Sequence, residues 1–92
     1  MNLQEIREEI NDIDEELLRL FIKRMELAKR VAEYKLEHKL PILNEAREQE
    51  ILARVCKASG EELEVYTETL FKTLFELSRS YQATLIKDSS SL

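Results

Sequence analysis

The residue that points most directly to chemistry is Arg24, a cation set into an apolar helical stripe. The stretch from Asn2 to Lys39 contains no Gly and no Pro and is expected to form one helix. Apolar residues recur along it every three or four positions, and Arg24 stands where the next apolar residue is due. An unpaired charge buried in such a stripe is very costly, so Arg24 needs an anionic partner. Its position indicates an anion-binding site.

Two further cations lie on the same expected helix. Lys35 follows Arg24 by eleven positions, so the two differ by only ~20° in azimuth and ~16 Å along the axis, with Val31 between them. The alternative for Lys35 is a side chain whose charged head reaches water. Arg7 lies ~25 Å before Arg24 along the axis, so the two cannot share a small ligand within one chain. Two antiparallel copies of the helix could bring them together; taken alone, Arg7 is an ordinary surface residue.

Polar residues of two later segments extend the candidate site. Arg47 and Glu48 fall in the first turns of a second expected helix, where an Arg opposes the helix dipole and thereby suggests a binding role. Glu48 can accept a hydrogen bond from a ligand hydroxyl, and a surface salt bridge is the alternative for Arg47. Ser78 and Gln82 share one face of a third helix within an otherwise apolar row. They form either a hydrogen-bonded core contact or a pair of donors into a pocket.

An all-α chain of one long, one short and one medium helix must position these residues. Pro41 is expected to end the first helix, and Asn44 is a natural N-cap for the second. Ser59 and Glu62 have the spacing of a capping box for the third. The expected helices are Asn2 to Lys39, Glu45 to Ala58 and Glu61 to Ile86. The first would be ~57 Å long, too long for this chain to bury alone, which indicates an oligomer.

Composition limits the classes of function. The 92 residues include 36% charged residues, one Gly and one Pro, which favours one helical domain, expected over residues 1–87 with a disordered tail at 88–92. A net charge of -5 argues against nucleic-acid binding. One Cys and one His are too few for a credible metal site, and Cys56 is expected to be a small apolar filler. No stretch suits a membrane span or a leader, so a cytoplasmic location is the default expectation.

The candidate residues together describe a pocket with several cations, one carboxylate and two neutral hydrogen-bonding groups. The sequence offers no nucleophile–base pair and no Gly-rich phosphate loop beside them. Such a pocket would hold a small polyanion in a fixed shape. It suits a reaction that is accelerated by positioning and electrostatics.

The sequence resembles the all-helical chorismate mutases (the AroQ class) from about Leu3 to Leu85. The segments that carry the resemblance are Ile6-Arg7-Glu8-Glu9-Ile10-Asn11-Asp12-Ile13-Asp14, Leu17-Leu18, Arg24 with Leu27-Ala28, Val31 with Tyr34-Lys35, Pro41-Ile42 and Arg47-Glu48, completed by Ser78 and Gln82. The resemblance implies an intertwined homodimer with two active sites. It also implies a cofactor-free Claisen rearrangement of chorismate, a dicarboxylate, to prephenate on the route to phenylalanine and tyrosine.

The resemblance further implies which residues bind the two carboxylates. Arg24 and Arg7 of the partner subunit would hold them, and Arg47 would support the pair. Guanidinium groups suit this task because they can bind a carboxylate through two parallel hydrogen bonds. Ser78 would assist at the ring carboxylate.

The remaining implied roles concern the ether and the ring. Lys35 and Gln82 would donate to the ether oxygen, where negative charge grows as the C–O bond breaks. Glu48 would hold the ring hydroxyl, and Val31 would form a wall of the site. Asn44 stands where many relatives have Asp, a change that a contact through the backbone should tolerate.

Two alternatives remain beside this interpretation. An isochorismate pyruvate lyase of the same fold would share much of the site, but its lysine lies in a mobile loop, whereas Lys35 precedes Pro41 on the expected helix. A non-catalytic helical dimerisation module would explain the apolar stripe but not Arg24 within it, nor Ser78 with Gln82.

Overall fold

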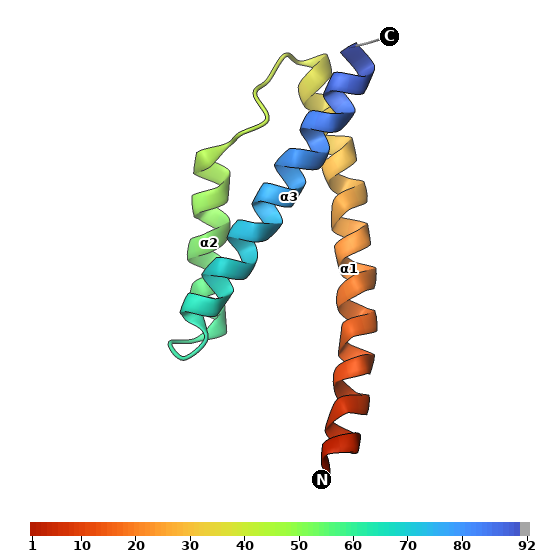
Figure 1. Cartoon of the computed structure of the whole chain (residues 1–92). Helices are drawn as coiled ribbons and strands as arrows, with labels where there is room; N and C mark the ends of the chain where they lie inside the picture. Colours follow the sequence, from red (N-terminus) through yellow and green to blue (C-terminus); the bar gives the residue numbers. More distant parts are fainter. Residues whose placement is uncertain (91–92) are drawn as a thin grey trace.

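The chain forms three α-helices, as the sequence predicts. The computed structural model describes residues 1–90 and contains α1 (Leu3–Glu37), α2 (Glu45–Ser59) and α3 (Glu64–Ser90), with no strand among the described residues. Helix α3 crosses the C-terminal half of α1, and α2 packs along the N-terminal half of α3 (Figure 1). The order of long, short and medium helix is therefore confirmed, with 35, 15 and 27 residues.

The end of α1 is fixed by backbone hydrogen bonds that reverse the chain direction. Lys39 has a positive φ of 54°, and the Leu40 amide donates to the Lys35 carbonyl at 2.8 Å while the Lys39 amide donates to that of Leu36 at 3.4 Å. This pattern is a Schellman motif with Lys39 in the left-handed position that Gly usually occupies. Pro41 follows two residues later and cannot continue the helix. The predicted end of α1 is correct to within two residues.

The predicted start of α3 is wrong, and so is the predicted capping box. Helix α3 begins at Glu64 after a turn, and the Ser59 hydroxyl donates to the Cys56 carbonyl within α2. The cause is Gly60, whose φ of 83° and ψ of 163° end α2 in a conformation that only Gly adopts readily. Ser59 thus remains the last residue of α2, and its hydroxyl is used there.

The predicted domain boundary at residue 87, with a disordered tail at 88–92, stays a prediction. Helix α3 is described as far as Ser90, and no Gly or Pro occurs after Gly60 in the sequence. Residues 91–92 lie outside the described part of the chain.

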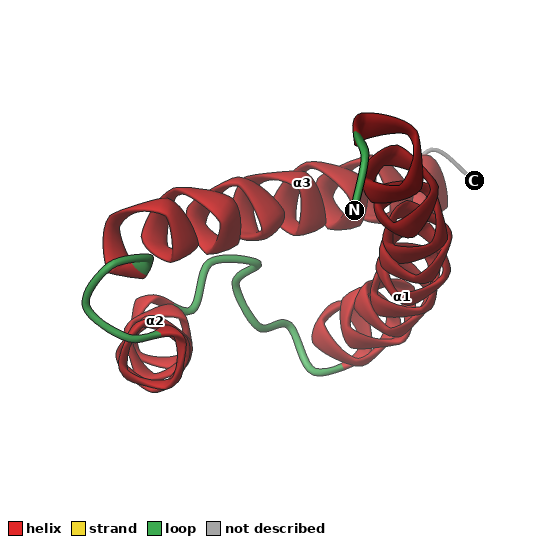
Figure 2. Cartoon of the chain, turned by 90° about the horizontal axis from the view of Figure 1, so that it is seen from below, coloured by secondary structure: helices red, strands yellow, loops and turns green. Residues whose placement is uncertain are grey.

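The core of the single chain is small and lies along α3. Its buried apolar residues are Ala28, Ala32, Leu52 and Phe75. The two alanines let α1 approach α3 closely, while α1 and α2 make no direct packing contact. Viewed from below, α3 bridges the other two helices, which stand apart (Figure 2). Every spatial relation between α1 and α2 therefore depends on α3 and on the connecting loop.

Much of the apolar stripe of α1 is exposed in the single chain. Leu3, Ile13 and Leu17 are each more than half exposed, and the N-terminal half of α1 projects away from the other helices (Figure 1). A contiguous exposed apolar surface of this kind usually marks an interaction site. None of the helices within the described residues has both the length and the hydropathy that a membrane crossing would need.

Cys56 has the environment of an unreactive thiol, as the sequence predicts for an apolar filler. It is half-buried between α2 and α3, and its Sγ donates to the Glu64 carbonyl at 3.8 Å. Burial, together with the negative charges of Glu64 and Glu68, raises the pKa of the Cys56 thiol above its ordinary value.

We expect Cys56 to react slowly with iodoacetamide in the folded protein. The thiolate is the reactive form, and a raised pKa lowers its population near pH 8. The measurement compares alkylation rates of folded and urea-unfolded chain at the same pH, and we expect the folded chain to be on the order of tenfold slower. A free thiol compound in the same urea concentration controls for the effect of urea on the reagent. Equal rates in the two states would contradict the assigned environment.

Candidate functional site

A single cavity between the three helices contains nearly all the predicted site residues. Its volume is about 330 Å³. Eight of the nine residues predicted from the sequence line it: Arg24, Val31, Lys35, Asn44, Arg47, Glu48, Ser78 and Gln82. The ninth, Arg7, belongs to the projecting N-terminal half of α1 and does not line the cavity (Figure 1). The cavity is thus built from side chains of all three helices and of the loop between α1 and α2.

The charge of the cavity is opposite to that of the chain. Four cationic side chains and one carboxylate line it: Arg24, Lys35, Arg47, Arg79 and Glu48. The chain as a whole carries a net charge of -5. Positive charge in a concave, partly desolvated site attracts small anions. The cavity therefore suits a small polyanion.

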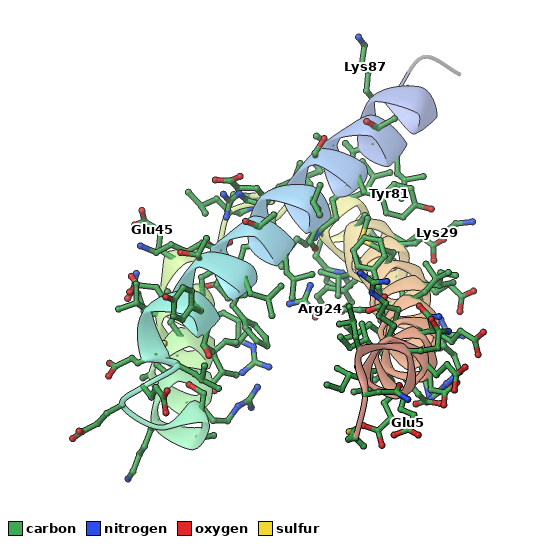
Figure 3. All side chains as sticks on the ribbon, turned by 60° about the horizontal axis from the view of Figure 1, so that its bottom comes forward. Glu5, Arg24, Lys29, Glu45, Tyr81 and Lys87 are labelled. Atoms are coloured by element: carbon green, nitrogen blue, oxygen red, sulfur yellow. The ribbon has the colours of Figure 1, made fainter. Side chains whose placement is uncertain are left out.

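Arg24 is half-buried, and its guanidinium packs on an aromatic ring. Its Cζ lies 5.9 Å from the centroid of the Phe75 ring, and Phe75 is only 4% exposed. Figure 3 shows Arg24 on the side of α1 that faces α2 and α3. No carboxylate among the described residues pairs with Arg24, so the cation–π contact orients the guanidinium while its N–H groups stay available to an anion.

Lys35 is tied to the loop that follows α1. Its Nζ donates to the Ile42 carbonyl at 2.5 Å, and the side chain is half-buried. The head group of Lys35 is therefore anchored by the chain itself, which differs from the alternative of an unattached head group in bulk water. An ammonium group has three donors, so this bond fixes the position of Nζ and leaves two donors for other acceptors in the cavity.

Arg47 and Glu48 are adjacent in sequence but have different partners. Arg47 pairs with Glu50 at 2.8 Å, and the two side chains are 52% and 68% exposed. This is the surface salt bridge that the sequence left open as an alternative, although Arg47 also lines the cavity. Glu48 instead pairs with Arg79 of α3, and both side chains are largely covered. Exposed pairs contribute little to stability, so Arg47 can exchange its partner at small cost.

Ser78 and Gln82 both contact each other and line the cavity. Gln82 is 5% exposed, and its Nε2 donates to the Ser78 hydroxyl oxygen at 2.9 Å. Its Oε1 is buried and has no hydrogen-bond partner among the described residues. A half-turn of the amide exchanges the two atoms, so that Ser78 donates to Oε1 and Nε2 becomes a free donor. The hydrogen-bonded core contact is therefore present, and the interpretation as donors into the pocket stays a prediction.

The sequence reasoning missed Arg79 and most of the apolar lining. The additional apolar lining residues are Leu27, Ala28, Ile42, Ile51 and Phe75. The signal for Arg79 was present, because it precedes Gln82 by three positions and so shares its face of α3. The apolar residues carry no individual signal, since their types and spacing equally suit a core.

Comparison with known proteins identifies the family. A family model described as chorismate mutase type II matches residues 6–83. The chain belongs to the chorismate mutase type II family. The resemblance inferred from the sequence is thereby confirmed, and the matched range includes all nine predicted site residues, from Arg7 to Gln82.

Three relatives of this chain differ in how much of their length it covers. The chain is 46% identical to the bifunctional chorismate mutase/prephenate dehydratase of Aquifex aeolicus over 59 residues, which are 64% of this chain and 16% of that protein. It is 46% identical to the T-protein of Haemophilus influenzae over 46 residues, which are 50% of this chain and 12% of that protein. It is 32% identical to the chorismate mutase of Methanocaldococcus jannaschii over 90 residues, covering 95% of this chain and 90% of that protein. The chain thus spans a small part of the first two relatives and nearly all of the third.

Asn44 contributes to the cavity through the backbone that it caps. Its side-chain oxygen accepts from the Arg47 amide at 3.1 Å at the start of α2. We expect Asn44→Ala to lower the free energy of unfolding by about 1 kcal/mol, because the cap is lost. Asn44→Asp is the matched control and should stay close to the unaltered protein, because Asp caps equally well.

The measurement is urea denaturation of the three proteins at one fixed protein concentration, since association can contribute to the measured stability. An Asn44→Asp protein as unstable as Asn44→Ala would show that Asn44 does more than cap the helix.

Proposed function

We propose that this chain is a chorismate mutase that converts chorismate to prephenate without a cofactor. The observation that carries the proposal is the combination of family membership with one cation-rich cavity lined by eight residues of the predicted constellation. The substrate is a dicarboxylate, which matches the surplus of positive charge in the cavity. A cytoplasmic location in aromatic amino acid biosynthesis is part of the same proposal.

The proposed mechanism is positioning with electrostatic stabilisation. Arg24, supported by Arg47, binds carboxylate oxygens and holds the substrate in a folded conformation in which the bonding carbon atoms lie close together. Lys35 and Gln82 donate to the ether oxygen as its bond to the ring breaks and negative charge accumulates there. The bond of Lys35 to the Ile42 carbonyl supports this role, because it limits the motion of Nζ before the substrate arrives.

The remaining proposed roles are those of the polar and apolar walls. Glu48 accepts from the ring hydroxyl, and Ser78 assists at the ring carboxylate. Val31 forms a wall, and Asn44 holds the first turn of α2 in place. These roles need no proton transfer to or from the protein, which accords with a lining that contains a single carboxylate, already paired, and no Cys or His.

The proposed active form is an intertwined homodimer in which Arg7 of the partner subunit completes each site. Two observations support it: the apolar stripe of α1 is exposed in the single chain, and α1 projects beyond the packing of α3. Antiparallel packing of two α1 helices would bury the stripe. The same packing would bring the start of one α1 beside the middle of the other, and so Arg7 towards Arg24.

The position of Lys35 favours the mutase over an isochorismate pyruvate lyase. Lys35 lies in the last turn of α1, before the loop begins, and its carbonyl also accepts the hydrogen bond that closes the helix. A lysine held in this way does not belong to a mobile loop. Parallel assays with chorismate and isochorismate compare the two activities directly.

We expect the purified protein to form prephenate from chorismate. We expect Arg24→Leu to lower kcat/KM by at least about 100-fold, because the removed cation no longer stabilises the negative charge of the transition state. Arg19→Leu is the matched control: it removes an exposed arginine of α1 that pairs with Glu16 outside the cavity.

A non-catalytic dimerisation module makes the opposite prediction for Arg24→Leu. It would gain stability from an uninterrupted apolar stripe and would lose no activity. A folded, unaltered protein without turnover above the spontaneous rate would refute the proposed function.

Mixing two inactive variants tests the shared site. Arg7→Ala and Arg24→Ala should each inactivate both sites of their own homodimer. In co-expressed mixtures about half of the dimers contain one chain of each kind, and one of their two sites then carries no substitution, so about a quarter of wild-type activity should return. Sedimentation measures the dimer in parallel. A site formed within one chain would give no recovery.

A further inference from the structure

The ion pair between Arg79 and Glu48 differs from the other ion pairs of the described residues. The others join residues three or four positions apart on one helix and have side chains at least 46% exposed. Arg79 and Glu48 join α3 to α2, and their side chains are 32% and 23% exposed. Both line the cavity. A pair that connects two elements in a partly desolvated wall fixes its members more firmly than a solvated pair on one helix.

The contact uses only one oxygen of the Glu48 carboxylate. Nη1 of Arg79 donates to Oε2 of Glu48, and the side-chain contacts of Glu48 among the described residues all use Oε2. A glutamate has three side-chain torsions and would otherwise sample several rotamers. The guanidinium restricts them and leaves Oε1 as a defined acceptor.

The same contact also solves an electrostatic problem. An unpaired carboxylate in this wall would repel an anionic ligand that the other cations attract. Arg79 balances the charge of Glu48, so the carboxylate can serve as a hydrogen-bond acceptor without opposing the binding of a dianion.

We propose that Arg79 is a positioning residue that orients Glu48 so that Oε1 accepts the hydrogen bond from the ring hydroxyl of the substrate. This inference rests on the proposed function and assigns Arg79 a role that acts through Glu48. It makes the α2–α3 ion pair a determinant of specificity for a hydroxylated ring.

The test measures selectivity for the hydroxyl. The probes are chorismate and an analogue in which hydrogen replaces the ring hydroxyl, and the readout is the ratio of their kcat/KM values. Arg79→Met keeps an unbranched stem and removes the charge, and it should lower this ratio about tenfold, the worth of one charge-assisted hydrogen bond. Arg79→Lys should retain the ratio to within about threefold, because it keeps the charge.

Two further variants separate positioning from a structural role. In a Glu48→Gln background, Arg79→Met should change the ratio by less than about twofold, because the carboxylate that it orients is gone. Arg19→Met is the matched control, since it removes an arginine from an exposed Arg–Glu pair outside the cavity and should leave the ratio unchanged. A purely structural Arg79 would lower activity towards both probes equally, and that unchanged ratio would overturn the inference.

If the wild-type protein does not turn chorismate over, calorimetric binding of the two probes supplies the selectivity ratio instead of kcat/KM. A wild-type protein that binds chorismate more tightly than the analogue but does not convert it refutes the proposed function alone. If Arg79→Met retains the wild-type ratio, in kcat/KM where chorismate is turned over or in binding where it is not, the inference about Arg79 fails. A wild-type protein with equal selectivity for chorismate and the analogue would overturn the inference about Arg79 as well.

Discussion

The packing of α3 against α1 is the contact on which the whole site depends. Ala28 and Ala32 are buried against α3 and allow the two helices to approach closely. Since α1 and α2 make no direct packing contact, the packing of α3 is the main determinant of how far Arg24 and Lys35 lie from Arg47 and Glu48. A larger side chain at either alanine would separate the helices and move both halves of the cavity apart. The small residues at this crossing thus set the distance between α1 and α3 as well as contributing to stability.

The loop between α1 and α2 provides the second constraint. It is anchored at its start by the Schellman motif at Lys39 and at its centre by the bond from Lys35 to the Ile42 carbonyl. At its end, the Asn44 side chain accepts from the first turn of α2. A loop held at three points behaves as part of the scaffold. The loop restrains Lys35, a cation that the proposed mechanism needs at a fixed place. The loop therefore helps to set the geometry of the site.

The helices and most of the cavity residues could be predicted from the sequence, but the partners of the charged residues could not. The helices followed from the near absence of Gly and Pro, and Arg24 was visible because its charge interrupts an apolar period. The partners of the charged residues were not predictable. Arg47 and Arg79 are both arginines on helix faces, yet one forms a surface pair with Glu50 and the other crosses between helices to Glu48. Only the helix packing decides which arginine meets which carboxylate. The start of α3 was missed for a local reason, since the positive φ of Gly60, 83°, ends α2 there and separates Ser59 from the turn that it was expected to cap.

Although the chain has a net charge of -5, it gathers four cations around one cavity. A buried cation does not stabilise a fold by itself, because its desolvation opposes burial. Here part of that penalty is offset within the chain: Phe75 packs beneath Arg24, the Ile42 carbonyl accepts from Lys35, and Glu48 pairs with Arg79. Each of these contacts leaves donor capacity unused. The folded chain therefore holds its cations in fixed positions while keeping them incompletely satisfied, and the proposed dianionic substrate would complete the balance. Such preorganised and unsaturated donors favour a bound anion more than flexible surface lysines would, since little reorganisation remains to oppose binding.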